Sequence, residues 1–274
     1  MPESFQPDLG AYFARTGYRG PREVSLATLD GILGAHTAAI PFENLDVLLG
    51  RPIDLAPAAI ERKLVHQQRG GYCFEQNAHL LHVLTALGFQ VTPLSGRVRL
   101  QQPRDCTPPR THLFLRVDLG GEQWLADAGI GALSLTSCIR LGREGEQATA
   151  HEPRRIVHEA GRFFHQARLG EEWTDVYEFT GEAMPPIDRE LANWWTSASP
   201  QSRFKQMLSI GRAGPAGTRF VIRNSEFIHR HGAEVLERCE ITTPGQLLEL
   251  LARHFGLHFP AGTRFGAPGS PWPN

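Results

Sequence analysis

Two features that would tie the chain to a membrane are missing from its 274 residues. No stretch approaches the ~18 apolar residues of a membrane span, and residues 1–12 have no basic stretch leading into an apolar one. An excess of charge is also missing, since 28 Lys and Arg residues stand against 29 Asp and Glu residues and leave a net charge of -1. Such a chain has no field that attracts nucleic acid or anionic lipid. We therefore expect an unsecreted protein with no membrane or nucleic-acid partner, whose ligand is a small molecule.

Cysteines are few and widely spaced. The four are Cys73, Cys106, Cys138 and Cys239, and no two of them form a C-x-x-C pair. This pattern fits neither a dense disulfide scaffold nor a ribbon-type zinc site. Reduced thiols are the simpler interpretation, which predicts a cytoplasmic protein. The sequence leaves the oligomeric state open.

The length predicts more than one hydrophobic core. Within residues 1–88, apolar residues recur at helical spacing and predict a mostly helical first domain. Residues 89–195 begin with short alternating runs broken by Gly and Pro, which predict a sheet or a small barrel. The strands expected there are residues 92–100, 112–119, 123–126 and 162–168.

Residues 196–274 contain both strand-like and helix-like patterns. A strand-like run at residues 219–223 precedes a helix that is expected to start at Pro244 and to end at Gly256. Residues 260–274 are rich in Pro and Gly and are expected to form a loose end.

Cys73 is the candidate nucleophile. It follows Gly70 and Gly71 and precedes an apolar series at helical spacing that ends at Gly88, which predicts that Cys73 lies in the first turn of a helix. Unpaired backbone N–H groups and the positive end of the helix dipole favour a thiolate there. The glycines allow close approach of a ligand, so the N–H of Cys73 can help to hold an oxyanion. For a cysteine without partners, a buried structural role is the more common interpretation.

A hairpin supplies the possible partners. Gly120-Gly121 suits a two-residue turn, which pairs Leu119 with Glu122. Side chains alternate between faces, so one face is expected to be core, while His112 and Asp127 share the other. They are then diagonal neighbours with Cα atoms ~7–8 Å apart. A carboxylate can orient an imidazole across that distance.

Together the three residues form a Cys–His–Asp arrangement. Asp127 would fix the tautomer of His112, and His112 would take the thiol proton and later return it to a leaving group. The argument needs a symmetric turn, because a slip of one residue moves Asp127 to the core face. In the alternative interpretation, His112 is a surface strand residue and Asp127 only begins a turn. The helical spacing after Cys73 and the register of the hairpin do not show whether the helix and the hairpin touch each other.

The same segments resemble the arylamine N-acetyltransferase family of bacterial type. Residues 69–75 resemble its cysteine motif, Thr111-His112 its histidine segment and residues 127–131 its aspartate segment. The likeness covers nearly the whole chain, with further matching segments at residues 40–46, 193–194 and 200–204.

The resemblance implies an α+β fold with three parts. These are an N-terminal helical bundle (1–88) with the nucleophilic cysteine, a central β-barrel (89–195) with the histidine and aspartate, and a C-terminal α/β lid (196–274), around a Cys-His-Asp core like that of cysteine proteases. It also implies acetyl-CoA as acyl donor and no metal. The acceptor is an arylamine, an arylhydrazine or an N-hydroxyarylamine, and the course is ping-pong through an acetyl-Cys73 intermediate, as in xenobiotic metabolism.

Further site residues follow from the resemblance alone. Glu43 and Arg69 are expected to form a structural ion pair beneath the pocket, and Gln76 is expected to serve helix packing only. No residue is assigned to coenzyme A. The residues expected to line the acyl and amine pocket are Phe42, Thr111, Gly129, Ile130, Gly131 and Phe204.

Ile130 stands where many relatives carry phenylalanine. Losing an aromatic ring there weakens stacking on an arylamine by ~0.5–1.5 kcal/mol. The preferred amine and the preferred acyl chain are therefore left open.

Three other interpretations are also considered. A cysteine hydrolase or an amide synthase is compatible with the triad, because water resolves a thioester as an amine does. A non-catalytic binding protein with an inert Cys73 is more remote. Glu75, His79 and His82 fall near one helical face, but without an H-E-x-x-H signature they are expected to form a solvated stripe and not a zinc site.

Overall fold

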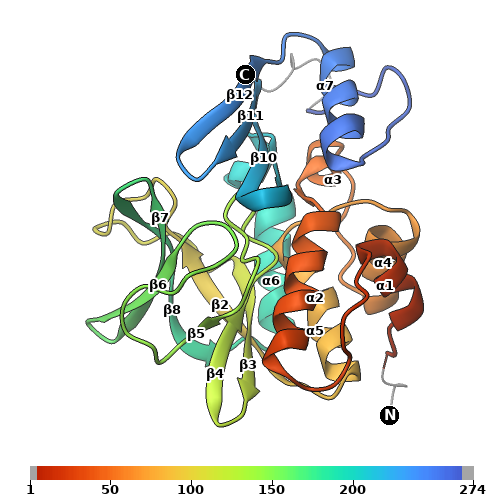
Figure 1. The fold of residues 1–274 in the computed structure, drawn as a ribbon. Helices are drawn as coiled ribbons and strands as arrows, with labels where there is room; N and C mark the ends of the chain where they lie inside the picture. The colour runs from red at the N-terminus through yellow and green to blue at the C-terminus, as the bar shows by residue number, and fades with distance from the viewer. Residues whose placement is uncertain (1–4, 267–274) are drawn as a thin grey trace.

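The structure is a computed structural model that describes residues 5–266. It combines helices with one seven-stranded and one five-stranded antiparallel sheet. In Figure 1 the helices of the N-terminal part lie beside the larger sheet, and the smaller sheet lies across one end of both. No helix among the described residues is long and apolar enough to cross a membrane.

The N-terminal part is helical, as its periodicity predicts. Asp8 and Ser25 cap the first two helices through their side chains, as short polar residues do at helix starts. The central helix α5 begins at Cys73, and its first eight residues are all buried. The helical segments are α1 (Leu9–Thr16), α2 (Leu26–Ala39), α3 (Leu45–Leu48), α4 (Pro57–Glu61), η1 (Arg62–His66) and α5 (Cys73–Ala86).

The seven-stranded sheet curls into a nearly closed barrel. Its strand order is β5-β4-β3-β2-β8-β7-β6. Gln147 joins the two edges: its backbone exchanges two hydrogen bonds with Arg154 of β6, and its side chain bonds the backbone of Arg140 in β5. The strands are β2 (Gln90–Val98), β3 (His112–Leu119), β4 (Glu122–Ala126), β5 (Ile139–Arg140), β6 (Arg154–Glu159), β7 (Arg162–Leu169) and β8 (Glu172–Ala183).

The predicted hairpin register is confirmed. Leu119 pairs with Glu122, and the register continues without a slip to Leu115 and Ala126. The face of Leu113, Leu115 and Val117 is core, as expected, and the opposite face of β3 is largely buried as well. The face of His112 looks into the barrel-like interior, where the ring meets Phe114 and Tyr177. The alternative of a surface histidine is therefore excluded.

The five-stranded sheet joins distant parts of the chain. Its order is β1-β9-β10-β11-β12, so an edge strand from the N-terminal part is completed by strands from the C-terminal part. A second hydrophobic core lies beneath it. The elements are β1 (Phe42–Glu43), α6 (Pro186–Ala198), η2 (Arg203–Lys205), β9 (Ser209–Ala213), η3 (Pro215–Gly217), β10 (Thr218–Arg223), β11 (Glu226–His231), β12 (Glu234–Glu240), α7 (Pro244–Leu250) and η4 (Leu251–Phe255).

The C-terminal predictions have mixed outcomes. Helix α7 begins at Pro244, and Gly256 closes the following turn with a φ of 65°. The expected loose end is wrong for residues 260–266, because Phe265 is packed in the second core and the N–H of Gly266 donates to the carbonyl of Leu48. Residues 267–274 lie outside the described residues.

Two elements cross the expected domain boundaries. β1 lies within residues 1–88 but pairs with β9, and α6 spans the boundary between residues 195 and 196. The three-part division stays a prediction.

Candidate functional site

Cys73 is the first residue of α5, where the sequence predicts it. Its thiol is nearly buried and lies 3.6 Å from the carbonyl oxygen of Thr111. The backbone N–H groups of the first helical turn have no partner within the helix. They provide, with the helix dipole, a positive electrostatic environment for the sulfur.

His112 and Asp127 form a buried pair. The Nε2 of His112 lies 2.8 Å from the Oδ2 of Asp127, so the other ring nitrogen, Nδ1, is free for Cys73. Burial alone would lower the pKa of His112, but the charge of Asp127, its hydrogen bond and the bond to Cys73 raise that pKa to about 10. Burial would raise the pKa of Asp127, and the pairing with His112 lowers it below its usual value. The pairing with Asp127 therefore favours the protonated imidazole.

Asn77 joins the helix to the hairpin, a role that the sequence analysis missed. Its Nδ2 donates to the Oδ1 of Asp127 at 2.9 Å and to the carbonyl of Leu113 at 2.7 Å, while its Oδ1 accepts from the N–H of Ala128 at 2.9 Å. Asn77 lies four residues after Cys73, on the same face of α5. The spacing of four residues from Cys73 was the sequence signal that could have indicated this role of Asn77.

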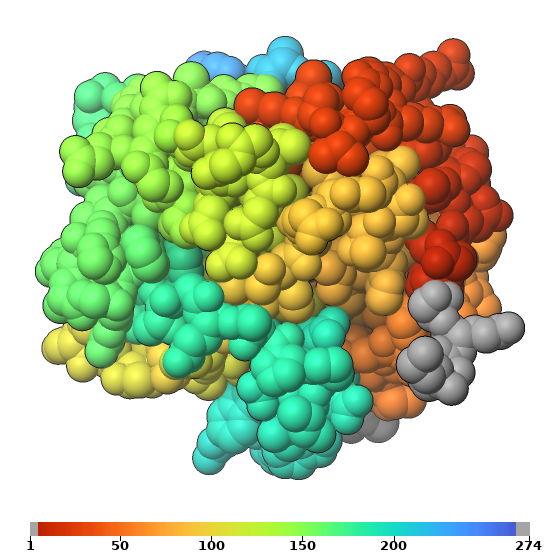
Figure 2. Space-filling view, turned by 90° about the horizontal axis from the view of Figure 1, so that it is seen from below, coloured from red at the N-terminus to blue at the C-terminus, as the bar shows by residue number. Residues whose placement is uncertain are grey.

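Gly129 allows the aspartate loop to touch the cysteine. A Cβ at this position would lie 2.5 Å from the Cα of Cys73 and 2.7 Å from the Nδ2 of Asn77. Its N–H also donates to the Oδ1 of Asp127 at 2.8 Å. In Figure 2, α5 lies between the β3–β4 hairpin on one side and the N-terminal helices on the other.

A buried ion network supports the start of α5. The expected ion pair of Arg69 with Glu43 is confirmed, with 2.8 Å between Nη2 and Oε1. Arg69 and Lys63 share Asp46, and Lys63 also reaches Glu75 at 2.6 Å. The other oxygen of Glu75 accepts the N–H of Tyr72, the residue that caps α5. The network thus fixes the backbone immediately before Cys73.

Gln76 does more than pack, contrary to expectation. It is fully buried, and its Nε2 donates to the carbonyl of Gly71 at 2.9 Å. Burial lowers the pKa of His36 to about 4, so this imidazole is neutral. It donates from Nε2 to the Oε1 of Gln76 at 2.8 Å and accepts the hydroxyl of Tyr12 at 3.0 Å. A polar chain therefore holds the glycine turn that precedes the cysteine.

The stripe of Glu75, His79 and His82 is not solvated as expected. Glu75 is bound to Lys63, and His79 is buried against the ring of Tyr12. Among residues 5–266, no three His, Cys, Asp or Glu side chains are grouped to hold a metal ion.

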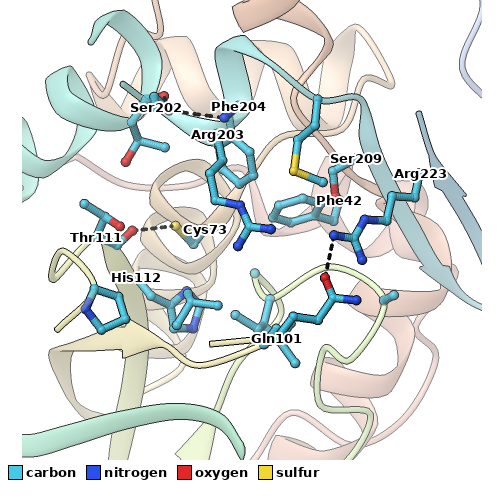
Figure 3. Close-up of a pocket in the computed structure, with 18 of the residues that line it drawn as sticks. Phe42, Cys73, Gln101, Thr111, His112, Ser202, Arg203, Phe204, Ser209 and Arg223 are labelled. Atoms are coloured by element: carbon cyan, nitrogen blue, oxygen red, sulfur yellow. Dashed lines mark hydrogen bonds between the residues drawn. The ribbon is translucent and has the colours of Figure 1, made fainter. Parts of the chain in front are cut away.

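A cavity of about 540 Å³ opens beside Cys73 and His112. Of the six expected pocket residues, five line it: Phe42, Thr111, Gly129, Ile130 and Phe204. Figure 3 shows Phe42, Thr111 and Phe204 around the cavity. Gly131 does not line the cavity but packs against Phe42, because a Cβ at Gly131 would lie 3.3 Å from the ring of Phe42. Lining residues that the sequence analysis did not single out include Val98, Trp195, Met207, Arg203 and Arg223.

Asn44 positions the aromatic wall. Its Nδ2 donates to the carbonyls of Phe204 and Met207 at 2.9 and 2.7 Å, and its Oδ1 accepts the N–H of Ser209. Phe204 then meets Phe42 edge to face, with ring centroids 5.9 Å apart. The neighbourhood of Cys73 is therefore aromatic on one side and polar on the other.

We expect Cys73 to react with iodoacetamide almost as fast at pH 6 as at pH 8. His112 has a raised pKa and stays protonated over this range, so its charge stabilises a thiolate. The rates at the two pH values should differ by less than about threefold. The measurement is loss of free thiol, with peptide mapping to separate Cys73 from Cys106, which is partly exposed. A rate that climbs steeply up to pH ~8.5, as for an unpaired thiol, would show that His112 does not activate Cys73.

Comparisons with known proteins show the family of the chain. A family pattern described as N-acetyltransferase matches residues 25–263. The chain is 39% identical over 249 residues to an arylamine N-acetyltransferase / N-hydroxyarylamine O-acetyltransferase of Salmonella typhimurium, covering 91% of this chain and 88% of that protein. It is also 39% identical to an arylamine N-acetyltransferase of Mycolicibacterium smegmatis, with coverage of 91% and 92%.

Solved structures of arylamine N-acetyltransferases are also similar to this chain. The Salmonella typhimurium arylamine N-acetyltransferase superposes with a TM-score of 0.88 at 36% identity and covers 96% of both chains. The Mycobacterium marinum enzyme in complex with CoA has a TM-score of 0.87 at 34% identity, with coverage of 91% and 92%. The family pattern and these relatives thus show that the protein is an acyltransferase. The chain belongs to the arylamine N-acetyltransferase family.

Proposed function

We propose that this protein transfers an acetyl group from acetyl-CoA to an aromatic amine, an arylhydrazine or an N-hydroxyarylamine through an acetyl-Cys73 intermediate. One observation carries the proposal. A cysteine at a helix N-terminus, beside a buried histidine–aspartate pair, faces a cavity of about 540 Å³. The relatives support the substrates, since one solved relative is a complex with CoA and a curated relative is also named as an N-hydroxyarylamine O-acetyltransferase.

In the first half-reaction the sulfur of Cys73 attacks the thioester carbonyl. The N–H of Cys73 donates to the oxygen that becomes negatively charged. When the intermediate collapses, the bond between carbonyl carbon and coenzyme A sulfur breaks, and the imidazolium of His112 gives its proton to the leaving thiolate. The protein is left with an acetyl-cysteine and a neutral histidine.

In the second half-reaction the amine attacks the acetyl carbonyl. His112 takes one proton from the amine nitrogen, and the bond to the sulfur of Cys73 breaks. The resting thiolate–imidazolium pair is restored. Asp127 keeps Nε2 of His112 protonated throughout, so that Nδ1 carries the transferred proton.

The acceptor ring would lie between Phe42, Phe204 and Ile130. The two phenylalanines offer ring edges and faces, whereas the aliphatic Ile130 adds contact area without stacking. Thr111 and Gly129 line the side next to the sulfur. These contacts favour a flat ring and leave the preferred amine to be measured.

The three-part division, with residues 196–274 as a lid over the triad, belongs to this proposal. So does a cytoplasmic location, which suits an enzyme that needs a reduced thiol. All four cysteines are free in the structure.

Intact-mass measurement tests the proposed function. Incubation with acetyl-CoA and no amine should add the mass of one acetyl group at Cys73 and release one equivalent of coenzyme A. An aromatic amine should then remove the adduct and appear as its N-acetyl product, and double-reciprocal plots should give parallel lines. Release of coenzyme A that continues without an amine would indicate a hydrolase and would overturn the proposal. Incubation with longer acyl thioesters in the same assay reads out the acyl-chain preference.

A further inference from the structure

Two arginines enter the cavity of Cys73 from the side of the smaller sheet. Arg203 lies in η2 and Arg223 ends β10, and Figure 3 shows both guanidinium groups directed into the cavity. Both side chains are also exposed, so they lie where the cavity meets solvent. No Asp or Glu is among the described residues that line the cavity.

These arginines differ from others near the same cavity. Along the loop of residues 99–111, each arginine has a carboxylate partner within 3.0 Å. Within the described part of the chain, Arg203 and Arg223 form no such ion pair. The paired arginines are Arg99 with Glu178, Arg104 with Asp175, and Arg110 with Glu182.

Arg223 is oriented without being neutralised. Its Nη2 donates to the Oε1 of Gln101 at 2.6 Å, across the opening between β10 and the loop after β2. Gln101 has a φ of 60°, a left-handed conformation that is uncommon outside glycine and tends to persist where it serves a site. The neutral amide fixes one edge of the guanidinium and leaves its positive charge and other N–H groups available.

We propose that Arg203 and Arg223 form an anion subsite at the opening of the cavity, which binds a phosphate or carboxylate carried by a substrate. A guanidinium binds either group through paired, charge-assisted hydrogen bonds. The inference rests on the proposed function and deepens it. In acetyl transfer the anion belongs either to the phosphates of coenzyme A or to a carboxylate on the acceptor ring.

The test measures equilibrium binding by calorimetry, so it needs no turnover. The ligands are coenzyme A, 4-aminobenzoate and its neutral counterpart 4-aminobenzamide. Arg203→Gln and Arg223→Gln should each raise the Kd of at least one anionic ligand by about 10-fold, and that of 4-aminobenzamide by less than about twofold. Arg→Lys at either position should recover part of the affinity, because the charge is kept while the planar fork is lost.

Lys205→Gln is the matched control. Lys205 lies in the same short helix as Arg203 and carries the same charge, but it is exposed and does not line the cavity. It should leave all three Kd values unchanged.

The ligand that responds identifies the source of the anion. If only the Kd of coenzyme A rises, the subsite belongs to the acyl donor. If only the Kd of 4-aminobenzoate rises, the subsite belongs to the acceptor. The subsite is refuted if the arginine variants have the same Kd values as Lys205→Gln, or if the Kd of 4-aminobenzamide rises as much as the Kd values of the anionic ligands. Acetylation of wild-type protein by the phosphate-free thioester S-acetyl-N-acetylcysteamine, followed by mass, tests the proposed transfer separately.

Discussion

Asp127→Asn is expected to lower kcat/KM by about 10³–10⁴-fold while the fold is retained. The Oδ1 position accepts from Asn77 and from the N–H of Gly129, so the asparagine must place its carbonyl there and point its NH₂ at His112. Nε2 of His112 then has to accept, which moves the ring proton to Nδ1. From there His112 cannot take a proton on the side of Cys73.

The same substitution changes the pH dependence. Burial lowers the pKa of His112, and the carboxylate of Asp127 is the main group that counteracts this effect. Without the carboxylate, the pKa of His112 falls from about 10. The imidazole becomes neutral at neutral pH, and alkylation of Cys73 at pH 6 should become slow. Steady-state kinetics and iodoacetamide rates measure the two effects. Asp118→Asn, on the same hairpin but partly exposed, is the control and should change neither.

The folded state should also respond to pH through His112. Its pKa in the folded protein is raised above the unfolded value of ~6.5, so its pairing stabilises the fold fully below that pH and progressively less as pH rises toward 10. In Asp127→Asn this dependence disappears. If activity fell by less than about tenfold, or the alkylation profile were unchanged, Asp127 would not orient the histidine.

Gly129→Ala is expected to reduce kcat/KM by more than about 10²-fold, since displacements near 1 Å have such effects in active sites. The added methyl group would lie 2.5 Å from the Cα of Cys73, a backbone atom that cannot rotate away. The loop must leave α5, which also breaks the bond from the N–H of Gly129 to Asp127. Stability should fall by about 1–3 kcal/mol, as for other overpacked sites.

Gly142→Ala separates this effect from the general cost of replacing glycine. Nothing lies within 4 Å of a Cβ at Gly142. Activity and Tm should stay at wild-type values in that variant. Near-normal acetylation by Gly129→Ala would mean that the close contact between loop and helix is dispensable.

Local signals predicted much of this site. The Gly120-Gly121 turn fixed the hairpin register, and the glycines before Cys73 marked the start of α5. Both features depend on neighbouring residues, whose backbone preferences are visible in the sequence.

Contacts between distant segments were not predictable in this way. Asn77 meets Asp127 across 50 positions, and Gln147 links the two edge strands of the barrel through its backbone and its side chain. Phe265 looked like part of a loose tail, because nothing in its own segment indicates the core that receives it. Such contacts follow from the packing of whole elements and not from a local period.

The pairing of β1 with β9 has a consequence for the order of assembly. Phe42 forms one wall of the cavity. One edge of its strand is bridged by Gly71, and the other edge is paired by Gly211 and Ile210, which emerge from the ribosome more than 160 positions later. Nascent chains that end before β9 can form helices and the hairpin, but they expose an unpaired strand edge where the cavity should be. Catalytic competence is therefore acquired only after β9 has been synthesised.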